Sequence, residues 1–95
     1  MRKRNLAFAE SLVVSSFRRR YLRELRGDQE RPRYEELAAD AVARLSVGGV
    51  RQLCEILKTE RAELRDLGDN RLADSLTSAI RGLDSRMQIL DDLLH

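Results

Sequence analysis

The chain has 95 residues, of which 36% are charged, 42% apolar and 4% aromatic, and its formal net charge is +2. This length corresponds to one small domain, and a single proline with five glycines excludes collagen-like and Pro/Gly-rich disordered sequences. One cysteine and one histidine exclude an intrachain disulfide framework and a zinc site built on these residue types. A chain this short buries roughly 60–65% of its unfolded surface, which favours a homodimer or docking onto a larger partner.

The first four residues, MRKR, are typical of the start of a secretory signal, but Glu10 and several serines interrupt the apolar run that should follow. The composition fits an organellar transit peptide better. A basic amphipathic helix that belongs to the fold is the preferred interpretation. No stretch reaches the ~20 apolar residues of a membrane span, so we expect a soluble, cytoplasmic protein with no membrane contact.

Apolar residues recur at spacings of three and four through residues 5–26, which predicts a long amphipathic helix. The stripe consists of Leu6, Ala9, Leu12, Val13, Phe17, Tyr21 and Leu25. The opposite face carries Arg18, Arg19, Arg23 and Glu24. Gly27 ends this helix, because glycine adopts the left-handed cap conformation without a steric cost.

A second helix is expected to begin at Pro32, whose missing N–H costs nothing at the first helical position. Its apolar stripe consists of Tyr34, Leu37, Ala38, Ala41, Val42 and Leu45. Ser46 is the predicted N-cap of a third helix, and the Gly48–Gly49 pair after it weakens the helix start. A hinge or a close helix approach is the alternative interpretation of this pair. The third stripe, which Glu60 interrupts, consists of Val50, Leu53, Leu57, Leu64 and Leu67.

The last helix has the most regular pattern in the chain, and Asp69 or Asn70 can cap its start. Spacings of four and three alternate through Ala73, Leu76, Ile80, Leu83, Met87, Leu90 and Leu94. Gly82 and the Ser85-x-x-Gln88 pattern allow a kink as an alternative to this continuous helix. The connection around Gly68 is only two or three residues long, so the third and fourth helices must lie antiparallel.

These patterns predict an all-α fold that forms one helical domain over residues 1–95. The expected architecture is a small four-helix bundle, or three helices plus an N-terminal arm, with a C-terminal antiparallel helical hairpin. Ile89 and Leu93 widen the apolar face of the last helix, which predicts a homodimer; central burial within one chain is the alternative. The predicted self-association residues are Leu83, Met87, Leu90 and Leu94.

No residue pattern supports catalysis, so we expect neither an enzyme nor catalytic, metal-binding or cofactor-binding residues. Cys54 lies beside apolar neighbours and is expected to be a small buried side chain. A nucleophilic cysteine needs a base, and the single histidine, His95, lies at the chain end. The serines lack a strand–elbow–helix context, and the glycines match no phosphate-binding loop or dinucleotide fingerprint.

Charge is distributed unevenly along the domain. Residues 1–34, the basic N-terminal helix and loop, carry ten basic and four acidic residues, whereas residues 35–95, the acidic helical body, carry eight and twelve. Arginine favours bidentate contacts with carboxylate or phosphate groups. We therefore expect contact with an acidic protein surface, which includes the acidic half of a second subunit. The residues predicted for this contact are Arg18, Arg19, Arg23 and Arg26.

Two alternatives to protein docking remain open for the arginines: a solvated face, and contact with nucleic acid phosphates, although no base-reading element stands out. The stretch Phe17-Arg18 with Tyr21 to Arg26 resembles the tyrosine–arginine motif of small mitochondrial LYR-type assembly factors. Ser16-Phe17-Arg18 replaces Leu-Tyr-Arg, the spacing is one residue too long, and nothing downstream matches, so this resemblance is not adopted. The expected function is a non-catalytic helical protein–protein interaction module: a regulator, adaptor or assembly factor.

Overall fold

The computed structural model describes the backbone of residues 2–27 and 32–94, and the side chains of residues 9–27 and 32–93. In chain order the helices are α1 (Arg2–Arg26), α2 (Tyr34–Arg44), α3 (Val47–Asp66) and α4 (Asn70–Leu94). These helices contain all the regular secondary structure of the described residues. The prediction of a small all-α bundle is confirmed.

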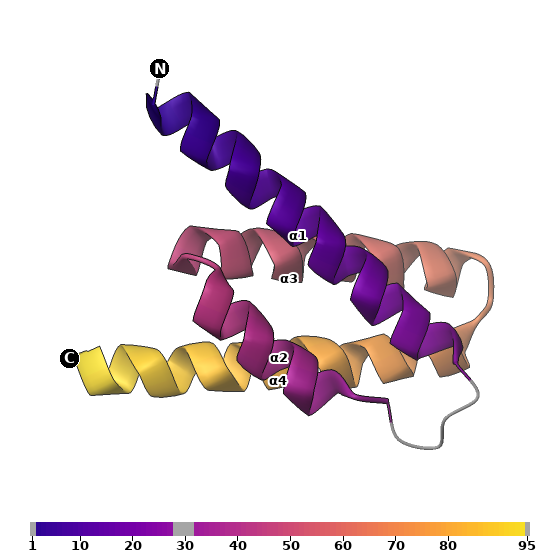
Figure 1. The fold of residues 1–95 in the computed structure, drawn as a ribbon. Coiled ribbons are helices and arrows are strands. Elements are labelled where there is room, and N and C mark those ends of the chain that lie inside the picture. Colours follow the sequence, from indigo (N-terminus) through magenta and orange to yellow (C-terminus); the bar gives the residue numbers. More distant parts are fainter. Residues whose placement is uncertain (1, 28–31, 95) are drawn as a thin grey trace.

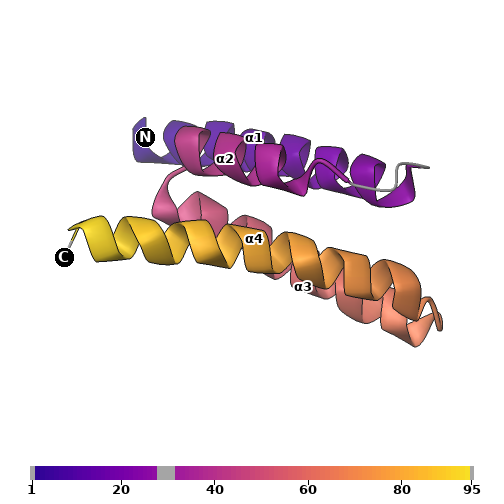
Figure 2. The ribbon, with the colours of Figure 1, turned by 90° about the horizontal axis from the view of Figure 1, so that it is seen from below.

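The four helices form two layers. In the lower layer of Figure 2, α3 and α4 lie side by side and antiparallel, as the short connection around Gly68 requires. In the upper layer, α1 and α2 cover this hairpin (Figure 2). Figure 1 shows that α1 crosses the hairpin diagonally and that its first turns extend past α3. Since α1 packs into the core, the four-helix arrangement is the one that forms.

Three helix ends follow the expected cap chemistry, whereas α1 ends before Gly27 as predicted but without the left-handed conformation expected of this glycine. The Ser46 hydroxyl accepts a hydrogen bond of 3.1 Å from the Gly49 backbone N–H, and the Asp69 carboxylate accepts one of 3.2 Å from the Leu72 N–H. Gly68 has φ +81°, the left-handed conformation that ends α3. The expectation for Pro32 was wrong: α2 begins at Tyr34, two residues later, and the proline belongs to the connection.

One apolar cluster fills the space between the layers, and all four helices contribute to it. Along α1 the predicted stripe is correct at Phe17, Tyr21 and Leu25 but wrong nearer the N-terminus. There Val14 is buried while Leu12 is 57% exposed, because α1 leaves the hairpin at an angle and presents a different face. Leu6 lies outside the described side chains.

Along α3 the stripe is correct from Val50 to Leu64, and Leu67 is 81% exposed because the helix has already ended there. The fourth helix is continuous from Asn70 to Leu94, so the kink allowed at Gly82 does not form.

Two tyrosines link α1 and α2 to the core: Tyr21 belongs to the buried cluster, and Tyr34 packs against it. The rings of Tyr21 and Tyr34 stack with centroids 5.9 Å apart. The Tyr34 hydroxyl lies 2.9 Å from the Ser75 hydroxyl, so a hydrogen bond ties α2 to α4. Burial raises the pKa of both tyrosines. The Tyr21 hydroxyl is fully buried and has no hydrogen-bonding partner among the described residues.

A close approach between helices holds the middle of α1. The Ser46 hydroxyl donates a hydrogen bond to the Glu10 carboxylate, which thereby lies at the positive N-terminal end of α3. A Cβ atom on Gly49 would overlap this carboxylate and lie 3.2 Å from the Cβ of Leu45. The glycine pair therefore contains a position of close helix approach, at Gly49, inside the first turn of α3.

Candidate interaction surface

The arginines of α1 divide into two groups. Those on the flanks of the buried stripe form ion pairs inside the bundle. The Arg18 guanidinium pairs with the Glu60 carboxylate on α3, with its Nε 3.0 Å from Oε1. Arg20 pairs with Asp40 on α2 at 3.1 Å, and its guanidinium lies over the Phe17 ring. These two arginines join α1 to its neighbours.

The placement of Arg18 corrects the expectation that it shares the outward face of α1. Its side chain lies on the flank towards α3, where it meets Glu60. Glu60 is the residue that interrupted the apolar stripe of α3, and its pairing with Arg18 explains why a carboxylate is tolerated there: only 18% of that side chain is exposed.

The outward group consists of Arg19, Arg23 and Arg26, which are exposed and follow one another at spacings of four and three. Such residues share one face of a helix, so the three guanidinium groups form a row about 10 Å long. Together with Leu22 and Gly27 they line an open hollow of about 490 Å³. Within the described part of the chain, none of the three forms an ion pair. We call this surface the arginine face.

A smaller pocket adjoins the arginine face and shares Arg23 with it. It also contains Arg20 and Arg33, but Glu24 and Glu36 line the same pocket, and the Glu24 carboxylate accepts a hydrogen bond from the Arg33 backbone N–H at 3.3 Å. Charges of both signs are therefore already matched here. This pocket is not suited to a free anion, whereas the described residues that line the arginine face include no carboxylate.

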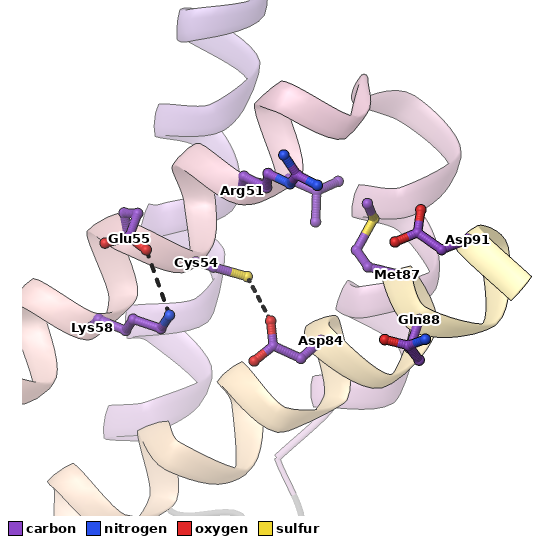
Figure 3. A pocket seen from close by; sticks show the side chains of 9 residues that line it. Arg51, Cys54, Glu55, Lys58, Asp84, Met87, Gln88 and Asp91 are labelled. Carbon is purple, nitrogen blue, oxygen red and sulfur yellow. Dashed lines mark hydrogen bonds and ion pairs between the residues drawn. The ribbon is translucent and has the colours of Figure 1, made fainter.

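A third hollow, of about 310 Å³, lies between α3 and the second half of α4 (Figure 3). The Cys54 thiol points across it towards Asp84, with the sulfur 3.7 Å from a carboxylate oxygen, and Lys58 pairs with Glu55 at its edge. Burial, followed by the negative charge of Asp84, raises the pKa of Cys54 to about 11. A thiol with this pKa stays protonated near neutral pH, so the site does not generate a thiolate nucleophile.

The four predicted self-association residues occupy different environments. Leu83 is completely buried inside its own chain and offers no surface to a second copy. Met87 packs partly against the core, Leu90 is half-buried, and the side chain of Leu94 lies outside the described part of the structure. The exposed apolar side chains near the C-terminal end of α4 are instead Ile89 and Leu93, at 58% and 78% exposure.

Comparison with known proteins finds no match: no family model, curated protein or solved structure is similar to this chain. Among the described residues, no three histidine, cysteine or acidic side chains are grouped so as to hold a metal ion. Of the helices that the structure describes, none combines the length and apolarity needed to cross a membrane. The strongest candidate for an interaction surface is the arginine face, of which sequence reasoning found three arginines and missed Leu22. Its position between Arg19 and Arg26 was the available signal.

Proposed function

We propose that the protein is a non-catalytic interaction module that binds an acidic protein surface through the arginine face of α1. The observation that supports this proposal is that the arginines of α1 form two groups. Arg18 and Arg20 form ion pairs with other helices, whereas Arg19 and Arg23 are exposed and point outward. Arg23 and Arg26 lie in the last turn of α1, where their positive charge also stabilises the helix dipole. Arg19 lies outside that turn, so the helix dipole does not explain why it shares their face.

A protein partner fits this surface better than nucleic acid for two reasons. Leu22 gives the hollow an apolar floor, which suits an aliphatic side chain surrounded by carboxylates. Phe17 and Tyr21 are buried, so the arginine face offers no aromatic ring on which a base could stack.

The non-catalytic part of the proposal is supported by the state of the single cysteine. Cys54 is buried, and Asp84, its nearest polar neighbour, raises the pKa of the thiol rather than accepting its proton at neutral pH.

Binding of a synthetic acidic peptide tests the proposed function. The probe is a fluorescent helical peptide with glutamates at positions i, i+4 and i+7 and a leucine between them, and anisotropy is measured at low and raised salt. We expect binding that weakens with salt and is lost in the double variant Arg19→Ala/Arg23→Ala. The matched control, Arg71→Ala/Arg81→Ala, removes the same charge from exposed positions on α4 and should bind normally.

Two results would overturn this function. Equal weakening of binding by both double variants would show a response to net charge without a defined surface. Tight binding to generic single- or double-stranded DNA, with no binding of the peptide, would assign the arginine face to nucleic acid instead.

A further inference from the structure

The C-terminal end of α4 carries an unusual combination of groups for the end of a helix. Asp91 and Asp92 lie in its last turns, and no basic residue accompanies them in the final turn. Ile89 and Leu93 are exposed on the same segment. We call this segment, residues 89–93, the acidic tip.

The acidic tip is complementary in charge to the arginine face, and both surfaces include apolar side chains. Ile89 and Asp92 are three residues apart, so a large apolar side chain and a carboxylate share one side of the helix. On the arginine face, Leu22 lies in the hollow between guanidinium groups from the same helix. Positive charges around an apolar floor thus match negative charges beside exposed apolar side chains.

These two surfaces cannot meet within one chain. The arginine face lies towards the C-terminal end of α1, near the turn that joins α3 to α4 (Figure 1). The acidic tip lies at the other end of the bundle, and Figures 1 and 2 agree on this separation. The longest dimension of the molecule is 42 Å, so contact between them requires two molecules.

We propose that the acidic surface bound by the arginine face is the acidic tip of a second copy of this chain. This inference rests on the proposed function and names its partner. Asp92 of one copy pairs with Arg19 and Arg23 of the other, and Ile89, on the same side of α4, enters the hollow above Leu22. Asp91 lines the hollow between α3 and α4, so it adds negative charge to the tip without lying in this contact.

A charge-swap experiment in the full-length protein tests this contact. The first variant, Arg19→Glu/Arg23→Glu, makes the face acidic, and the second, Asp91→Lys/Asp92→Lys, makes the tip basic. Each variant alone should associate at least about tenfold more weakly than the unchanged protein, since like charges then face one another. An equimolar mixture should restore association, because each variant supplies the surface that the other needs.

Light scattering after size-exclusion chromatography measures these states at tens of micromolar protein. Circular dichroism verifies folding, and Arg71→Glu/Arg81→Glu is the control for net charge. A monomeric unchanged protein, or undiminished association of the tip variant, overturns the inference. If the unchanged protein is monomeric but binds the acidic peptide, the proposed function stands and only the face–tip contact is refuted. If it neither associates nor binds the peptide, the proposed function and the face–tip contact are both refuted. Loss of association that mixing does not restore also refutes the face–tip contact.

Discussion

Replacing Gly49 with alanine tests the close approach of α1 to the start of α3. The added Cβ overlaps the Glu10 carboxylate and displaces it from the Ser46 hydroxyl and the positive end of α3. Losing such a charge-assisted contact costs about 1.5–3 kcal/mol, and the partial exposure of Glu10 places the loss at the lower end. Alanine returns about 1 kcal/mol of helix propensity. The free energy of unfolding should therefore fall by about 0.5 kcal/mol.

Gly48 is the matched control, because a Cβ there meets only the Ser46 hydroxyl oxygen, at an ordinary 3.8 Å. Gly48→Ala should raise the free energy of unfolding by about 0.5–1 kcal/mol, so the two variants differ by about 1–1.5 kcal/mol, which corresponds to about 4–12 °C in melting temperature. Urea unfolding followed by circular dichroism measures both. In a Glu10→Ala background the penalty at Gly49 should disappear. If Gly49→Ala stabilises as much as Gly48→Ala in the unchanged background, the close approach is not formed.

Three further predictions concern stability. Gly68→Ala should lower the free energy of unfolding by about 1 kcal/mol from backbone conformation alone, because its φ is +81° and a Cβ meets no atom there; an unchanged urea midpoint would contradict this. Tyr34→Phe should cost about 1 kcal/mol through its lost hydrogen bond to Ser75, whereas Tyr21→Phe should cost less, since that hydroxyl has no described protein partner; equal costs would refute the difference. The folded state raises the pKa of Cys54 from 9.0 to about 11. The contribution of this thiol to the free energy of unfolding is therefore complete below pH 9.0 and falls between pH 9.0 and about 11, by about 1.4 kcal/mol per pH unit. Cys54→Ala should flatten this part of the stability–pH curve, and an identical slope in the variant would exclude the thiol as its cause.

Much of the fold follows from local sequence signals. The helix ends at Ser46, Gly68 and Asp69 could be predicted, because a cap hydrogen bond or a left-handed glycine involves only residues a few positions apart in the sequence. The exposure of Leu12 and the burial of Val14 could not be predicted in this way. They depend on the angle at which α1 crosses the hairpin, and a single-helix pattern contains no information about that angle.

The candidate site was predictable only in part for the same reason. A run of arginines in the sequence indicates a positively charged segment. Which of these arginines point outward depends on where the carboxylates of other helices lie. Arg18 meets Glu60, 42 residues later, and Arg20 meets Asp40. The burial of Leu83 is likewise a tertiary effect, since its heptad position is the same whether a helix packs inside one chain or against a second one.

The layered arrangement has a consequence for the order of folding. Contacts within the α3–α4 hairpin begin at a three-residue turn, whereas those that attach the upper layer, such as Arg18 to Glu60 and Tyr34 to Ser75, span 42 and 41 residues. Short loops close at a lower entropic cost, so the hairpin can assemble first and α1 docks onto it afterwards. Amide hydrogen exchange should therefore be slowest in the hairpin and faster in α1. We therefore expect α1, the helix that carries the arginine face, to dock last during folding and to detach first on local unfolding.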